Sequence, residues 1–207
     1  MHSLDLDAVR AAPVTASPFA FVVVPGFVRG DAVAAVTADF PRIAKPGSFP
    51  PEELEFGPAF ARLLDELRGP EVTACLGEKF AVDLSGRPTL VTVRGRAAPR
   101  DGRIHTDSES KVVTALIYLN PAWEAPGGRL RLLRSAQDLD DYIVEVPPDA
   151  GTLLAFRRSA NSFHGHRPFS GERRSIQINW LTDAAVARRE QARHRLSARL
   201  KRLNPFA

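Results

Sequence analysis

The sequence predicts an α+β domain, mainly β, in which helices come first and short strands then form a sandwich or barrel. Two observations carry this prediction. Apolar residues recur at helical spacing before residue 88, and from residue 89 short β-branched runs alternate with turn signals. The chain has 207 residues, enough for one sizeable core, and its 44% hydrophobic and 25% charged residues are typical of globular proteins. We therefore expect a single domain over residues 1–207.

The first part of the chain, 19–88, is predicted to be a lead-in of one strand and several helices. Residues 1–18 are expected to be irregular, and the apolar run 19–24 is expected to be a buried strand that ends at Pro25-Gly26. Helices are predicted at about 31–40, 58–68 and 70–80. The second is the clearest, because four apolar residues occupy positions i, i+3, i+4 and i+7: Phe60, Leu63, Leu64 and Leu67.

The barrel core is predicted over 89–183 from a series of short strands separated by turns rich in glycine, proline and asparagine. These strands are expected at 89–94, 111–119, 129–133, 142–146, 152–156, 162–166 and 174–181. Many short strands with such punctuation are typical of a sandwich or a barrel.

A basic helix is predicted at 184–203, and it holds the excess positive charge of the chain. The net charge is +4, but residues 184–207 contain seven Lys or Arg against Glu190 alone, so residues 1–183 carry a net charge of −2. This distribution argues against a nucleic-acid partner. Apolar residues follow one side of the helix, which is typical of packing on its own domain or against a second copy in a homodimer: Ala192, Leu196, Leu200 and Leu203.

The cysteine content and the N-terminal residues predict a cytoplasmic protein. The single cysteine, Cys75, excludes an intramolecular disulfide and fits a reducing compartment. The first residues lack the cationic and long apolar segments of a signal peptide. The most apolar stretch, 19–28, is too short to span a bilayer, so no membrane partner is expected.

Residues suited to metal chemistry occur in His105-Thr106-Asp107 and, far downstream, in Phe163-His164-Gly165-His166. In a strand, residues i and i+2 point to the same face, so His105 and Asp107 would project side by side. A histidine from a distant strand would complete two histidines and one carboxylate on one face of a metal. That ligand set, with positions left open, suits non-haem Fe(II).

Taken with its downstream context, this motif resembles the Fe(II)/2-oxoglutarate-dependent dioxygenases and, among them, the prolyl 4-hydroxylase-like branch. The resemblance covers about residues 89–183 and, more loosely, 19–40. It is carried in order by His105-Thr106-Asp107, residues 115–120 (ALIYLN), Trp123, residues 127–130 (GGRL), residues 151–156 (GTLLAF), His164 with Pro168, and Arg174 with Trp180. The family fold is a double-stranded β-helix, a jelly-roll or cupin-like barrel with helices packed on one side.

The resemblance implies that His105, Asp107 and His164 bind Fe(II), that 2-oxoglutarate is the cosubstrate, and that ascorbate is a further cofactor to test. Strand alternation alone does not separate His164 from His166. The family's proline four residues after the histidine selects His164, and His166 is then a surface residue or a neighbour of the ligands. The implied reaction hydroxylates an unactivated C–H bond and forms succinate and CO2. Implied substrates are a prolyl-type peptide residue, an amino acid or another small molecule.

A cation is needed for the far carboxylate of 2-oxoglutarate, and arginine can pair with both of its oxygens. Arg173 and Arg174 lie on opposite faces of the last predicted strand. Arg174 has the family's spacing from the metal-binding histidine. It also shares its face with three apolar residues that would line the barrel: Ile176, Ile178 and Trp180. Arg174 is therefore the predicted cosubstrate residue, with Arg173 facing solvent.

Two further features concern the cosubstrate and the substrate. Tyr118 occupies a position at which related prolyl hydroxylases have a tyrosine hydrogen-bonded to the cosubstrate, although an ordinary strand aromatic fits equally well. Relatives often carry a tyrosine on the strand before the iron motif, and residues 93–96 (VRGR) contain none. Basic residues near the expected mouth, such as Arg94 and Arg103, form either a solvated loop or a rim that attracts an acidic substrate.

Two other functional classes stay open beside the hydroxylase. A cupin-like metalloprotein, such as an isomerase or hydrolase, would use the same ligands without 2-oxoglutarate. A non-catalytic binding domain would keep only the barrel. A buried arginine facing the metal argues against the first class, and the complete ligand set argues against the second.

Overall fold

The computed structural model describes residues 2–203, and their side chains as far as residue 197. The chain begins with helices and one strand: α1 (Leu6–Ala11), β1 (Phe21–Val24), α2 (Gly30–Ala38), the 3-10 turn η1 (Pro51–Glu53), α3 (Pro58–Arg68) and α4 (Pro70–Phe80). The strands follow: β2 (Thr89–Ala97), β3 (Lys111–Tyr118), β4 (Leu130–Leu133), β5 (Tyr142–Val146), β6 (Leu153–Arg157), β7 (His164–Gly165) and β8 (Gly171–Leu181). Helix α5 (Ala184–Leu203) comes last.

The short helix α1 lies in the stretch that was predicted to be irregular. Asp5 caps it, because its side chain accepts a hydrogen bond from the Ala8 backbone N–H at 2.9 Å. Val9 is the buried residue of this helix, and it joins the hydrophobic core that includes α4. A helix this short has no apolar periodicity to read, so packing on α4 stabilises it where propensity would not.

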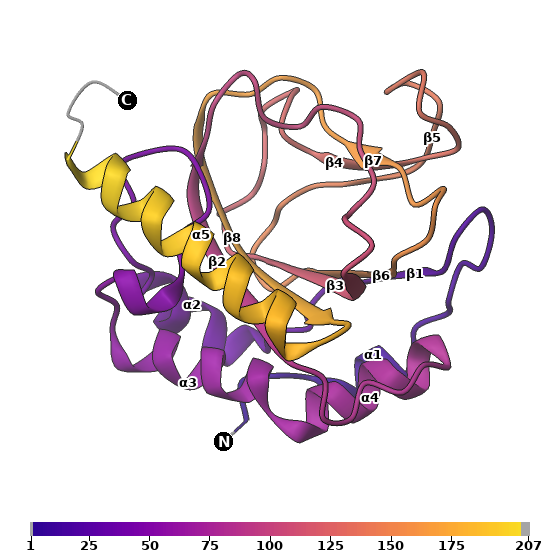
Figure 1. Ribbon diagram of the computed structural model, residues 1–207, viewed down its shortest axis with the longest axis horizontal. Helices are drawn as coiled ribbons and strands as arrows, with labels where there is room; N and C mark the ends of the chain where they lie inside the picture. Colours follow the sequence, from indigo (N-terminus) through magenta and orange to yellow (C-terminus); the bar gives the residue numbers. More distant parts are fainter. Residues whose placement is uncertain (1, 204–207) are drawn as a thin grey trace.

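The strands form two antiparallel sheets that face each other. The larger sheet has the order β1-β6-β3-β8-β2, and the smaller has the order β5-β4-β7. Figure 1 shows helices α1 to α4 along the outer side of the larger sheet, with the smaller sheet on the opposite side. This arrangement confirms the predicted double-stranded β-helix with N-terminal helices packed on one side and a C-terminal helix.

The larger sheet is buried on both faces. Its outer face packs on the helices: Ile176, Ile178 and Trp180 share one core cluster with α3 and α4 residues, and the Trp180 indole donates to Thr73 Oγ1 at 3.2 Å. The prediction that these three residues line the barrel interior was therefore wrong. The inward face of β8 instead carries the alternate, mostly polar residues that line a cavity: Arg173, Ser175, Gln177 and Asn179.

Helix α5 is anchored at its start and runs alongside β2 and β8 (Figure 1). Ala187 is buried against Leu90 and Leu181. The predicted packing stripe does not contact the domain where it is described, because Ala192 and Leu196 are exposed, Leu196 by 61%. Leu200 and Leu203 lie outside the described side chains. No helix in the described part of the chain combines the length and the apolar character needed to cross a membrane.

Candidate active site

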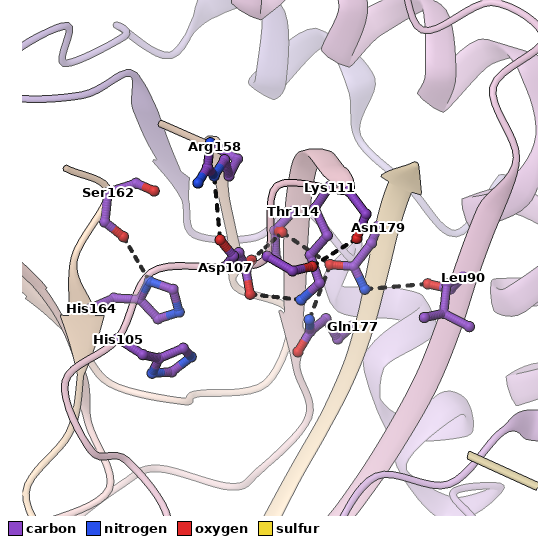
Figure 2. A network of polar contacts seen from close by, with 12 residues as sticks. Leu90, His105, Asp107, Lys111, Thr114, Arg158, Ser162, His164, Gln177 and Asn179 are labelled. Atoms are coloured by element: carbon purple, nitrogen blue, oxygen red, sulfur yellow. Dashed lines mark hydrogen bonds and ion pairs between the residues drawn. The ribbon is translucent and has the colours of Figure 1, made fainter. Parts of the chain in front are cut away.

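Two side chains of one segment and a third from a distant part of the chain line the same cavity. One ligand atom from each of His105, Asp107 and His164 lies within 4.8 Å of the others. His105 and His164 face each other across two backbone hydrogen bonds, His105 N–H to His164 O at 3.0 Å and His164 N–H to His105 O at 2.9 Å. Figure 2 shows the two imidazoles side by side, with ring centroids 4.3 Å apart. The pairing of a loop with β7 therefore fixes both histidines.

Backbone carbonyls determine which nitrogen each imidazole offers. His105 Nδ1 lies 2.8 Å from Arg103 O, and His164 Nδ1 lies 3.0 Å from Ser162 O. A carbonyl only accepts, so both Nδ1 atoms carry hydrogen and both Nε2 lone pairs are left for a metal. Burial, followed by the neighbouring His105, lowers the pKa of His164 to about 4, against the opposing effect of Asp107. His164 is thus neutral near pH 7, as a metal ligand must be.

The third candidate ligand, Asp107, is held by two hydrogen bonds. Its Oδ1 accepts from Lys111 Nζ at 2.6 Å, and its Oδ2 accepts from Thr114 Oγ1 at 2.5 Å. Burial acts to raise the pKa of Asp107, but the cation Lys111, the neighbouring His164 and the two hydrogen bonds lower it overall. The carboxylate is therefore ionised, and the network continues from Thr114 to Asn179 at 3.0 Å (Figure 2).

A cavity of about 570 Å³ extends from the three candidate ligands. Its volume falls in the range of small-molecule sites, about 300–1,000 Å³. His166 also lines this cavity and is 6% exposed, so it is not a surface residue. Its ring packs on Gly102, where a Cβ would lie 2.4 Å from His166 Nδ1. His166 does not join the cluster of three candidate ligands.

The two arginines of β8 lie on opposite sides of the sheet. Arg173 lines the cavity, is 6% exposed, and donates from Nε to Gly128 O at 2.7 Å. Arg174 points to the outer side, where it pairs with Glu172 at 2.8 Å and lies over the Phe40 ring at 5.4 Å. The prediction that Arg174 faces the barrel interior was therefore wrong, and Arg173 occupies that position.

Strand β8 is irregular beside the two arginines, but this irregularity does not change which face each of them shares. Arg94 pairs with Ser175, whereas Arg96 pairs with Glu172, so β8 has one residue more than β2 over this interval. The extra residue is a β-bulge in the segment that contains Arg173 and Arg174. Alternation still puts Arg173 on the cavity face with Ser175 and Gln177, so the prediction for Arg174 was wrong because the apolar face of β8 meets the helices.

Tyr118 lies beside Arg173, whose guanidinium carbon is 5.4 Å from the centre of the tyrosine ring. The ring is fully buried, and its hydroxyl makes no hydrogen bond with any residue that the structure describes. Burial raises the pKa of Tyr118, against the lowering effect of Arg173, so the hydroxyl keeps its proton. A buried donor without a partner costs about 1–3 kcal/mol. Tyr118 and Arg173 together therefore fit an anionic group supplied by a ligand.

Comparison with protein families agrees with this site. Residues 97–182 match the family model of the 2OG-Fe(II) oxygenase superfamily, a segment that includes all three candidate ligands and Arg173. No curated protein matches the chain.

Solved structures show the same fold at low sequence identity. A prolyl-4-hydroxylase from Pseudomonas putida has a TM-score of 0.55 and 22% identity, over 87% of this chain and 94% of that chain. A prolyl 4-hydroxylase from Phytophthora capsici has a TM-score of 0.55 and 18% identity, over 89% of this chain and 64% of that chain. HygX from Streptomyces hygroscopicus, with nickel and 2-oxoglutarate bound, has a TM-score of 0.54 and 16% identity, over 78% of this chain and 81% of that chain. Over residues 97–182, which hold the converging ligand set, the chain is therefore similar to the 2OG-Fe(II) oxygenase superfamily, and its fold is that of the solved prolyl 4-hydroxylases.

Proposed function

We propose that the protein is a hydroxylase in which His105, Asp107 and His164 bind Fe(II), and in which Arg173 and Tyr118 bind the distal carboxylate of 2-oxoglutarate. One observation carries this proposal. Two imidazoles with free Nε2 atoms and an ionised carboxylate share a cavity with a buried arginine, and that arginine lies over a tyrosine whose hydroxyl has no described partner. Such a ligand set leaves positions open for a bidentate cosubstrate and for oxygen.

The residues of the chain have distinct tasks in this reaction. When bound, iron and 2-oxoglutarate supply the oxidising chemistry, with O2 consumed and succinate and CO2 released as the substrate C–H bond becomes C–OH. Arg103 O and Ser162 O orient the imidazoles, and Thr114 with Lys111 orients the carboxylate. Three apolar residues of the cavity wall reduce access of water to the buried end: Leu116, Leu130 and Phe156.

For the substrate, we propose an amino-acid or peptidyl group, with a prolyl-type residue as the first candidate. The support is the likeness in fold to prolyl 4-hydroxylases from Pseudomonas putida and from Phytophthora capsici. The cosubstrate proposal is supported by the likeness to HygX, whose structure holds 2-oxoglutarate.

An anaerobic titration of the Fe(II) protein with 2-oxoglutarate tests this proposal. We expect a weak visible charge-transfer band, and we expect succinate after oxygen is admitted. Asp107→Ala should remove both, whereas His166→Gln should still bind iron, because His166 is outside the ligand cluster. If 2-oxoglutarate at millimolar concentration does not bind the Fe(II) protein, the hydroxylase proposal is wrong and a cupin-like metalloenzyme replaces it.

A further inference from the structure

Arg94 is one of the arginines that line the cavity and that the proposed cosubstrate site does not use. Arg94 of β2 pairs with Ser175 and is therefore a diagonal neighbour of Arg173 on the inward side of the sheet. Its Nε donates to Ser48 Oγ at 2.9 Å, and its Nη1 is 3.8 Å from Asp101. Burial lowers the pKa of Arg94, Asp101 raises it, and Arg173 lowers it further. Asp101 partly offsets the charge of Arg94, and the like charges of Arg94 and Arg173 on adjacent strands still repel each other.

Helix α5 also lines the cavity. Ala187 anchors the helix on Leu90 and Leu181, and the next inward positions, Glu190 and His194, line the cavity together with Arg193. This spacing follows one helical face. His194 is half-buried, whereas the next residue, Arg195, is exposed. Burial lowers the pKa of His194, and Arg193, Lys111 and Arg94 lower it further against the opposing effect of Glu190, so the imidazole is neutral near pH 7.

More cationic than anionic side chains line the cavity. Six cations line it, against three carboxylates. Each carboxylate already has a cationic partner: Asp101 with Arg94, Asp107 with Lys111, and Glu190 with Arg193. The charges of Fe(II) and of the 2-oxoglutarate dianion cancel each other, so the loaded cavity would keep the same positive excess. Such a field attracts an anionic molecule beyond the cosubstrate.

We propose that Arg94 and His194 form a subsite at the cavity mouth for a carboxylate group of the substrate. This inference rests on the proposed function, because it assigns Arg173 to 2-oxoglutarate. One guanidinium and one neutral imidazole match the two acceptor oxygens and single charge of a carboxylate, whereas a phosphate offers three oxygens and more charge. The carboxylate could belong to a free amino or organic acid or to the end of a peptide, and both sources share this chemistry.

Binding of acetate, compared with its neutral analogue acetamide, tests the subsite. The protein is labelled with 15N-histidine, loaded with redox-inert Zn(II) and saturated with 2-oxoglutarate, so that Arg173 is occupied. At constant ionic strength, acetate should shift the ring resonances of His194 at millimolar concentration, and acetamide should not. Arg94→Gln should weaken the acetate response at least tenfold, and Arg94→Lys, which keeps the charge without the planar fork, should weaken it less. Arg195→Gln, on the exposed side of α5, is the matched control and should change nothing.

The proposal is overturned if acetate and acetamide shift the His194 resonances equally, or if neither shifts them. It is also overturned if Arg195→Gln weakens the acetate response as much as Arg94→Gln does. A stronger response to inorganic phosphate than to acetate would also overturn it. Two further comparisons then separate the two sources of the carboxylate. Binding of free amino acids is compared with binding of their amides, and binding of short peptides with a free C-terminus is compared with binding of the same peptides with an amidated C-terminus. Binding of 2-oxoglutarate is measured in the same samples. An acetate response without 2-oxoglutarate binding would refute the proposed function alone. Binding of 2-oxoglutarate without an acetate response would refute the subsite alone.

Discussion

Arg173 and Tyr118 meet inside the barrel, with the guanidinium carbon 5.4 Å from the centre of the tyrosine ring. Gly128 sets the direction of the arginine, because its carbonyl accepts from Arg173 Nε at 2.7 Å and its φ of +79° is one that side-chain-bearing residues rarely adopt. The tyrosine hydroxyl beside this cation makes no hydrogen bond with any described residue. A buried cation and an unpaired hydroxyl donor at one point define the place for a carboxylate.

Substitution of the two neighbouring arginines should have very different effects on 2-oxoglutarate binding. Arg173→Ala removes a buried charge-assisted pair, which typically costs about 2–5 kcal/mol, so the Kd of 2-oxoglutarate should rise at least about 30-fold. Arg174→Ala removes a partly exposed ion pair on the far side of the sheet and should change the Kd less than about fivefold. The visible band of the anaerobic Fe(II) complex reports both values. Equal effects would show that the inward position of Arg173 is not what binds the cosubstrate.

Tyr118→Phe should separate ligand binding from folding stability. A hydrogen bond to a charged group contributes about 1.5–3 kcal/mol, so loss of the hydroxyl should raise the Kd of 2-oxoglutarate about tenfold or more. The free energy of unfolding without ligand should not fall, because the buried hydroxyl has no described partner to lose. Urea denaturation of the metal-free protein measures this. A loss of stability would mean that the hydroxyl is bonded within the protein, and its assignment to the cosubstrate would fail.

Thr114→Val should weaken metal binding, because it removes the hydroxyl while leaving the side-chain volume nearly unchanged. The hydroxyl donates to Asp107 Oδ2 at 2.5 Å, and loss of a group that orients a ligand typically costs 10- to 100-fold in metal affinity, as an order of magnitude. Thr114→Ser keeps the donor and is the matched control. Competition titrations with Zn(II) and a chelator give the affinities. If valine binds Zn(II) as tightly as serine does, Lys111 alone suffices to orient Asp107.

The metal-free protein should lose stability in acid as two histidines are forced to take up protons. Burial, followed by the neighbouring His105, lowers the pKa of His164 from 6.5 to about 4. Burial, followed by the charge of Arg173, lowers the pKa of His166 from 6.5 to about 4. Between these two pH values the unfolded chain binds the protons and the folded chain does not, so the stabilising contribution is complete above pH 6.5 and is lost as pH falls toward 4. Each histidine contributes about 3 kcal/mol at most, since one pKa unit corresponds to about 1.4 kcal/mol.

Urea denaturation between pH 7 and 4 checks this dependence, with His166→Gln as the comparison. That variant should flatten the pH dependence by removing one of the two groups. A free energy of unfolding that stays constant over this range would contradict the buried, neutral state of both histidines.

The sequence by itself determined the fold class and the identity of the elements that bring the site together. Apolar residues at i, i+3, i+4 and i+7 identified α3, and short β-branched runs between turns identified the strands of both sheets. These signals are local, since side-chain periodicity follows directly from helix and strand geometry. The motif His105-Thr106-Asp107 supplied two of the three side chains that the fold brings within 4.8 Å, and the resemblance to the dioxygenases selected His164 over His166 as the third.

Only the tertiary structure decided which side of each element faces the site. Alternation along β8 marks an apolar face, and the sequence cannot say whether that face meets the helices or the barrel interior. Here the apolar face meets the helices, and the polar face lines the cavity, with Arg173 directed inward past a β-bulge. Helix α5 shows the same effect, because its inward face carries Glu190 and His194 while Leu196 is exposed. The physical reason is that a barrel built around a polar site buries polar side chains, so apolar periodicity no longer indicates the interior.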